Sequence, residues 1–197
     1  MRGEYNAFGW EVPTIWTLKD PGVTILQSKR GKNHRIELVE MKHVLMVCMG
    51  NICRSPMAET VGRKLASDAG LSPQLKFDSA GTHAHSVAMR PDPRADAALL
   101  RRGYELGRIR SRRVVLPDFQ KFDFILAMDL DNLQELQRQC PPEFQYKLRL
   151  LLDFADGLTG KEVPDPYYGN DQGFERVLDL CEAGCKAWVD HLTPSLR

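Results

Sequence analysis

The sequence of 197 residues has no long apolar run and no strong excess of either charge. A membrane-spanning helix needs about 20 consecutive apolar residues, and neither such a stretch nor a charged-then-apolar secretory leader occurs. Lysine and arginine number 27 against 26 aspartate and glutamate, so the formal net charge is +1. A nucleic-acid-binding protein that relies on bulk positive charge is therefore not expected. We expect a cytoplasmic protein that binds neither nucleic acid nor membrane.

The cysteines also lack the spacings of a metal site. The chain has five of them, with no CxxC pair and no Cys/His cluster at zinc-finger spacing, so the cysteines predict no zinc-finger site. We expect no metal and no cofactor. Cys181 and Cys185 lie four residues apart on an apolar, helix-like stretch and are predicted to pack in the core. No internal repeat or low-complexity tract is visible, and 43% hydrophobic residues support one domain with a real core.

The most informative segment that is present is CMGNICRS, from Cys48 to Ser55. It follows the apolar run 44–47 and precedes a helical pattern. A loop between the carboxyl end of a strand and a helix turns several backbone N–H groups toward one point, with the positive end of the helix dipole behind them. Arg54 adds a planar fork that suits two phosphate oxygens. The segment predicts a loop that binds a phosphate dianion, with Cys48 beneath the phosphorus as the nucleophile.

The residue types in this loop fit that chemistry. Helix N-termini and nearby cations favour the thiolate, which is the nucleophilic form of cysteine, and the Ser55 hydroxyl can donate a hydrogen bond to the sulfur. Gly50 and Asn51 tolerate the left-handed backbone of a tight anion-binding loop. Ser55 is predicted to be the N-cap of the helix, with Pro56 at its first position. The other loop members are expected to contribute to phosphate binding: Met49, Ile52 and Cys53.

Residues 47–59, VCMGNICRSPMAE, resemble the signature of the low-molecular-weight protein tyrosine phosphatases. Three further segments agree in order: DSAGT at 78–82, Met128-Asp129 followed by Asn132-Leu133, and DPYYGND at 165–171. The resemblance runs from about residue 41 to the C-terminus. It implies a metal-free enzyme that hydrolyses phosphotyrosine through a phosphocysteine intermediate, with tyrosine-phosphorylated proteins as partners. A monomer is favoured, and the oligomeric state is otherwise open.

Transfer of a phosphoryl group from a phenol needs a general acid at the leaving oxygen. Asp165 lies between Pro164 and Pro166, which stiffen a loop around a single carboxylate. The resemblance implies that Asp165 is this acid and then the base that activates water against the phosphocysteine. It also implies that Tyr167 and Tyr168 flank the mouth of the pocket.

The resemblance assigns supporting roles as well. Asn51 and Ser55 would organise the loop, and Asp129 would support it. His85 stands where the family often has a tryptophan or tyrosine that lines the slot for the phosphotyrosine ring, so ring stacking is expected to be weaker here. Cys53 is a candidate resolving thiol: it could convert a sulfenic acid at Cys48 into a disulfide, a behaviour that the family suggests too. The alternative is that Cys53 simply packs.

Other functions share the same loop. Phosphoarginine phosphatases have it, but resemblance suggests that they carry threonine where this chain has Ile52. Thiol-linked arsenate reductases need a downstream pair of redox cysteines, whereas residues 110–139 contain no cysteine and Cys140 stands alone. A non-catalytic phosphate-binding module is the third alternative, and the intact nucleophile, arginine and aspartate argue against it.

Strand-like and helix-like segments alternate after residue 41. Strands are predicted at 43–49, 75–79, 122–128 and 147–152, with a short one at 113–116. Helices are predicted at 57–69, 93–102, 131–139 and 173–191. This alternation predicts an α/β fold: a three-layer sandwich with a central four-stranded parallel sheet flanked by helices, and the phosphate loop after the first strand.

The first 40 residues carry no phosphatase motif. We expect residues 1–40 to be an N-terminal extension outside a catalytic domain at 41–197. A mis-assigned start codon is one alternative. Another is a small hairpin appended to the sheet, because 14–18, 23–27 and 35–39 have strand-like alternation. A cluster of arginines between 101 and 113 is expected to form a solvated face. The resemblance implies a structural role for Arg112, because an arginine is common at this position in the family.

Overall fold

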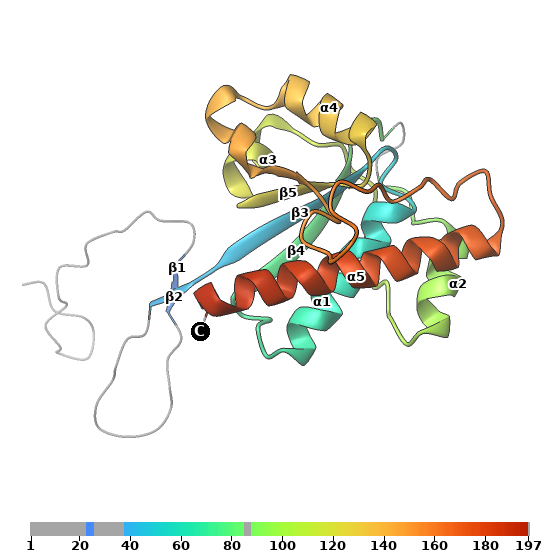
Figure 1. Ribbon diagram of the computed structural model, residues 1–197, viewed down its shortest axis with the longest axis horizontal. Coiled ribbons are helices and arrows are strands. Elements are labelled where there is room, and N and C mark those ends of the chain that lie inside the picture. Colours follow the sequence, from blue (N-terminus) through green and yellow to red (C-terminus); the bar gives the residue numbers. More distant parts are fainter. Residues whose placement is uncertain (1–22, 26–37, 85–87, 197) are drawn as a thin grey trace, which may run out of the picture.

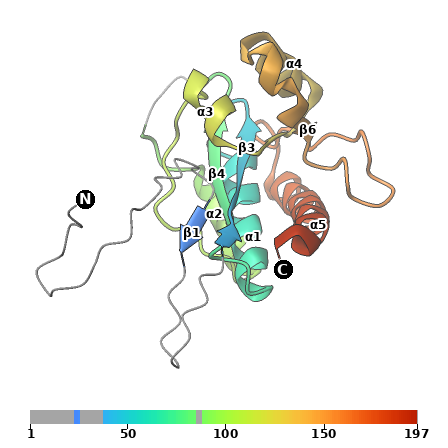
Figure 2. The ribbon, with the colours of Figure 1, turned by 90° about the vertical axis from the view of Figure 1, so that its left-hand side faces the viewer.

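The computed structural model describes residues 23–25, 38–84 and 88–196. Its centre is a four-stranded sheet in the order β4-β3-β5-β6, and every neighbouring pair is parallel. The strands are β3 (Lys42–Cys48), β4 (Leu75–Gly81), β5 (Phe124–Ala127) and β6 (Leu148–Leu150). Figure 2 shows β3 and β4 side by side. The predicted parallel α/β architecture is confirmed.

Helices cover both faces of this sheet (Figure 1). One face carries α1 (Arg54–Asp68), α2 (Pro93–Arg101) and the long α5 (Asp171–Leu196). The other carries α3 (Leu116–Lys121) and α4 (Leu130–Gln139), and a 3-10 turn, η1 (Pro142–Lys147), leads into β6. Within the described ranges, no helix is long and apolar enough to cross a membrane.

Strand β3 supplies side chains to two separate cores. Val44 and Met46 pack into the core beneath α1 and α5, while Leu45 and Val47 pack into the core beneath α3 and α4. All four side chains are fully buried, and burying each contributes roughly 1.5–3 kcal/mol. A strand covered on both faces is apolar at every position rather than at alternate ones. This continuous apolar run is why the sequence predicted a strand here.

The predicted strand at 113–116 is wrong. Arg113 makes only an isolated parallel bridge with Gly81, and Leu116 already begins α3. The Asp118 carboxylate accepts a hydrogen bond from the Val115 N–H at 2.9 Å, which closes the first turn of the helix. The Asp118 side chain thus favours a helix start at this point, although the apolar, β-branched residues Val114 and Val115 are typical of a strand.

The start of α1 also differs from the prediction. The helix begins at Arg54, and Cys53 rather than Ser55 is the N-cap residue. Ser55 does not cap because its hydroxyl lies 3.0 Å from the Cys48 sulfur and 3.3 Å from the Ala80 carbonyl oxygen. Pro56 is tolerated inside the first turn, where backbone N–H groups have no intrahelical partner. Gly70 follows the helix with a φ of +73°, the left-handed conformation that commonly ends a helix.

At the N-terminal end, β1 (Val23–Ile25) pairs antiparallel with β2 (Leu38–Glu40) in a two-stranded sheet of their own. The predicted strand at 14–18 lies outside the described residues. Assignment of residues 1–40 to a region outside the catalytic domain stays a prediction.

Much of the arginine cluster is ion-paired rather than simply solvated. Arg101 and Arg102 on α2 pair with carboxylates of α5, including Glu175. Arg112 bridges Asp78 at 3.0 Å and Asp118 at 2.9 Å. Arg112 therefore ties β4 to α3, in agreement with the structural role expected for it.

Candidate active site

The loop from Cys48 to Ser55 joins the carboxyl end of β3 to the N-terminus of α1. The Cys48 side chain is only 2% exposed, and its sulfur lies 3.0 Å from the Ser55 hydroxyl oxygen. The Asn51 backbone N–H also points at this sulfur, with an N···S distance of 3.3 Å. The sulfur therefore lies beside the N-terminus of α1 with a backbone N–H directed at it.

Asn51 shapes the loop from within. Its φ is +54°, the left-handed conformation predicted for it, whereas Gly50 is not left-handed, so that part of the prediction is wrong. The buried Asn51 amide donates to the hydroxyls of Ser55 and Ser79 at 3.0 and 2.9 Å. Its carbonyl oxygen accepts the Arg112 backbone N–H at 2.9 Å. These bonds over-determine a strained backbone position, which fixes the loop.

The hydrogen-bond chain continues into α1 through residues that the sequence reasoning missed. The Ser79 hydroxyl donates to the Glu59 carboxylate at 2.6 Å, and Glu59 also pairs with Arg63 at 3.1 Å. Burial raises the pKa of Glu59 above its ordinary value. The hydrogen bond from Ser79 and the charge of Arg63 act in the opposite direction but do not cancel this rise. Ser79 belongs to the DSAGT segment on the strand beside β3, and that adjacency was the available signal.

Arg54 lies buried under the loop and faces two carboxylates. One terminal nitrogen donates to Asp129 and, at 3.2 Å, to the Val163 carbonyl oxygen, while the other donates to Asp165 at 2.9 Å. Burial alone would lower the pKa of Arg54. The nearby Cys48 sulfur and both carboxylates outweigh it and raise the pKa above its ordinary value. The guanidinium therefore stays a cation.

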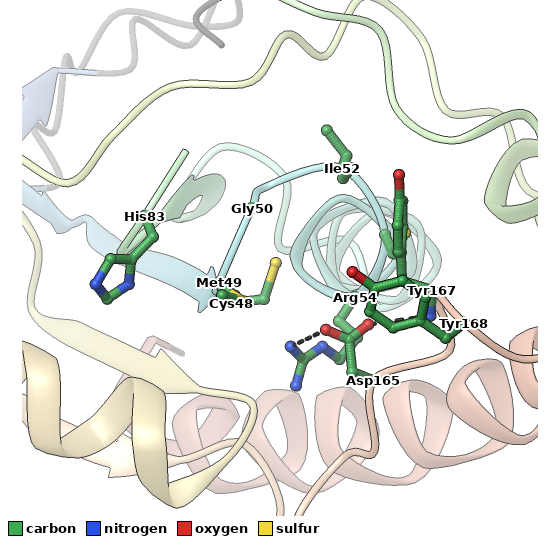
Figure 3. Close-up of a pocket in the computed structure, with 10 residues that line it drawn as sticks. Cys48, Met49, Gly50, Ile52, Arg54, His83, Asp165, Tyr167 and Tyr168 are labelled. Carbon is green, nitrogen blue, oxygen red and sulfur yellow. Dashed lines mark hydrogen bonds and ion pairs between the residues drawn. The ribbon is translucent and has the colours of Figure 1, made fainter. Parts of the chain in front are cut away.

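A cavity of about 310 Å³ opens above Cys48. Figure 3 shows Cys48 between His83 on one side and the two tyrosines on the other, with Asp165 bonded to Arg54. The Asp165 side chain is 44% exposed and Tyr168 is 97% exposed. The lining residues are Cys48, Met49, Gly50, Ile52, Cys53, Arg54, His83, Asp165, Tyr167 and Tyr168.

Two predicted site residues, Asn51 and Ser55, do not line this cavity, because they are buried in the loop itself. The predicted site residue His85 lies outside the described residues. His83, which the sequence reasoning did not select, forms part of the wall. Its backbone N–H donates to the Met49 carbonyl oxygen at 2.8 Å, so the chain after β4 runs beside the phosphate loop.

No metal site accompanies this cavity: the described residues hold no group of three or more His, Cys, Asp or Glu that could bind a metal ion. The cavity itself brings together a cysteine sulfur, a buried cation and a partly exposed carboxylate.

Comparison with known proteins identifies the family of this chain. Residues 43–196 match the family model described as low molecular weight phosphotyrosine protein phosphatase. The chain belongs to this phosphatase family. The family enzyme of Gallus gallus is 40% identical to this chain over 152 residues, and that of Homo sapiens is 39% identical to it over 150 residues. These alignments cover 77% and 76% of this chain and 96% and 94% of the two enzymes.

A solved structure agrees with the sequence comparison. The protein tyrosine phosphatase of Entamoeba histolytica, crystallised with Hepes in the active site, superposes with a TM-score of 0.75 at 40% sequence identity. The match covers 78% of this chain and 98% of that phosphatase. The residues before the matched region therefore lie beyond the length shared with these relatives.

The phosphatase loop contains a second thiol, Cys53. Cys53 is buried and lines the cavity beside Cys48. Both cysteines are free thiols rather than members of a disulfide. Burial first, and then the charge of Asp92, raise the pKa of Cys53 to about 12. Cys53 is therefore held as a neutral thiol close to the candidate nucleophile. The predicted core positions of Cys181 and Cys185 are confirmed, since both are fully buried.

Proposed function

We propose that this chain hydrolyses phosphotyrosine in proteins through a phosphocysteine intermediate on Cys48. The observation that carries the proposal is that the Cys48 sulfur, the Arg54 guanidinium and the Asp165 carboxylate meet in one cavity. Backbone N–H groups of the loop and the Arg54 fork bind the phosphate oxygens. No metal or cofactor takes part in the proposed chemistry.

In the first step the Cys48 thiolate attacks phosphorus and a P–S bond forms. The bond from phosphorus to the tyrosine oxygen breaks, and the Asp165 carboxylic acid gives its proton to that leaving oxygen. In the second step the Asp165 carboxylate takes a proton from water, and the oxygen of that water attacks phosphorus. The P–S bond then breaks, which releases phosphate and restores the thiolate.

The contact between Asp165 and Arg54 explains how the acid would acquire its proton. A phosphate dianion in the cavity competes with Asp165 for the Arg54 guanidinium, because both are anions that accept from the same N–H groups. A dianion close to a carboxylate favours the protonated carboxylic acid. Substrate binding would therefore turn Asp165 from a partner of Arg54 into a proton donor.

The walls of the cavity suit an aromatic ring. Ile52 and Met49 supply apolar surface at the loop, and Tyr167 faces them from the Asp165 loop. Aromatic rings pack well against such surfaces, whereas an arginyl side chain would leave its charged nitrogens against the apolar Ile52. We infer that tyrosine-phosphorylated proteins of the cytosol are the substrates and that a monomer acts on them.

The test is phosphate release from a phosphotyrosyl peptide and a phosphoarginyl peptide, assayed side by side in EDTA, with Cys48→Ser as the control. Turnover of the phosphotyrosyl peptide by the wild type alone is expected. Preference for phosphoarginine would contradict the role given to Ile52. Binding without turnover of either peptide would favour the phosphate-binding module, and thiol-dependent arsenate reduction would favour the reductase.

A further inference from the structure

Arg94 lies on α2, outside the cavity, but its guanidinium contacts the loop that carries Asp165. One terminal nitrogen donates to the Tyr167 carbonyl oxygen at 3.0 Å, and the other donates to the Gly169 carbonyl oxygen at 3.3 Å. Both carbonyls belong to the turn that follows Asp165, which the Gly169 N–H closes onto the Pro166 carbonyl oxygen at 2.9 Å. Arg94 therefore bridges a helix of the domain and the loop with the candidate general acid.

The other side of the Arg94 guanidinium is fixed by Asp92. This carboxylate caps α2 by accepting the Arg94 backbone N–H at 2.8 Å, and it accepts the guanidinium at 3.1 and 2.8 Å. The Asp92 backbone N–H in turn donates to the carbonyl oxygen of Ile52 at 2.8 Å. A continuous set of hydrogen bonds thus links the phosphate loop to the Asp165 loop.

The geometry requires an arginine. The four side-chain hydrogen bonds of Arg94 use four of the five N–H groups in a planar fork. The guanidinium carbon also lies 4.7 Å from the centre of the Phe174 ring and 5.7 Å from that of Tyr167. Lysine has three donors on one atom and no plane, so it could not hold both carbonyls and Asp92 together.

The Asp165 loop has an anchor at each end. Before Asp165, the Val163 N–H donates to the Met128 carbonyl oxygen at 2.7 Å. After it, Arg94 holds the carbonyls of Tyr167 and Gly169. The segment between these anchors is largely exposed, so packing alone does little to fix it. A general acid must lie within hydrogen-bond reach of the leaving oxygen, and a misplacement of about 1 Å can cost 100-fold in rate.

We propose that Arg94 is a positioning residue for the general acid: it holds the backbone that follows Asp165 so that this carboxyl group meets the leaving oxygen of the substrate. Arg94 touches neither the phosphate nor the nucleophile in this role. The inference rests on the proposed function, because it takes Asp165 to be the acid.

The test compares kcat/KM for a series of aryl phosphates whose leaving phenols differ in basicity. Arg94→Ala is expected to lose about 10-fold more activity on the most basic phenol than on the least basic one, since a basic leaving group depends most on the proton. Arg101→Ala is the matched control. Arg101 lies on the same helix, but its guanidinium pairs with Glu175 of α5 at 2.6 Å, and it should keep the wild-type dependence.

Arg94→Lys separates positioning from folding. It keeps a positive charge beside Asp92, so we expect a melting temperature near that of the wild type together with the steep dependence on the leaving group. If the wild type is active and both Arg94 variants lose activity equally on every phenol, or lose none, the positioning role alone would be overturned. A wild type that releases no phosphate from any aryl phosphate would overturn the proposed function and this role with it.

Discussion

At the residue scale, Asp165 and Cys48 share one cation. Arg54 bonds to Asp165 directly, and the Cys48 sulfur contributes to holding Arg54 in its charged form. The three groups are therefore electrostatically coupled. In the proposed mechanism, Cys48 and Asp165 change charge in each half of the reaction, while Arg54 stays a cation. The hydrogen bonds of Asn51 keep the loop fixed.

Asp165→Asn is expected to lower kcat/KM on a phosphotyrosyl peptide by roughly 100- to 10,000-fold, because the amide cannot give up a proton. The loss should shrink on an aryl phosphate with an acidic leaving phenol. Asp171→Asn is the control, since Asp171 begins α5 and does not line the cavity. Steady-state kinetics on both substrates measure the effect, and an equal loss on the two would argue against an acid at this position.

We expect Cys53 to influence the response to peroxide. Resolution of a Cys48 sulfenic acid needs the Cys53 thiolate: its sulfur forms the S–S bond while the S–O bond breaks, and the hydroxide that leaves takes a proton from solvent to become water. The pKa of Cys53 is raised to about 12, so below that value its thiolate fraction rises about tenfold per pH unit. The ratio of Cys48–Cys53 disulfide to Cys48 sulfinic acid should therefore rise steeply between about pH 7 and 9.

Peptide mass spectrometry after mild peroxide treatment measures this ratio. Cys140→Ser, which removes a buried thiol at the end of α4, should not change it. Sulfinic acid at Cys48 without any disulfide across that range would show that Cys53 only packs.

At the scale of elements, β4 approaches the phosphate loop so closely that Gly81 must lack a side chain. A Cβ there would lie 2.7 Å from the Met49 carbonyl oxygen and 3.0 Å from the Asn51 nitrogen, both backbone atoms. Gly81→Ala should therefore displace the loop, lower kcat/KM and cost about 1–3 kcal/mol of stability.

Gly62→Ala is the matched comparison. Its Cβ would lie 2.8 Å from the Phe77 ring, between α1 and β4 and away from the loop. It should lower the melting temperature with little change in kcat/KM of the folded enzyme. Equal kinetic losses in the two variants would indicate that general destabilisation, rather than loop displacement, is responsible.

The sequence predicted the sheet because its strands are apolar runs buried on both faces. It failed where the partner of a side chain, rather than the local pattern, decides the structure. Ser55 is a residue type typical of an N-cap, yet its hydroxyl contacts the Cys48 sulfur. The 113–116 segment makes only an isolated bridge at Arg113, because the Asp118 carboxylate accepts the Val115 N–H and α3 begins at Leu116. His83 was missed because its place on the wall comes from the path of the chain after β4 rather than from any local pattern.

At the scale of the whole molecule, the family match spans residues 43–196. Among the described residues, the two-stranded sheet forms no strand pairing with the four-stranded one. We expect removal of residues 1–40 to leave kcat/KM and the melting temperature nearly unchanged, because β1 and β2 are lost together. Calorimetry and kinetics on the truncated chain measure this. A loss of several degrees would show that the extension packs on the catalytic domain.

The central claim is that Cys48 carries the phosphoryl group between the two half-reactions. Rapid acid quench during turnover of a phosphotyrosyl peptide, followed by peptide mass spectrometry, tests it most directly. We predict a phosphoryl group on the peptide that contains Cys48 in the wild type and none in Cys48→Ser. Sustained turnover by the wild type with no phosphoryl group on Cys48 at any time would contradict the account.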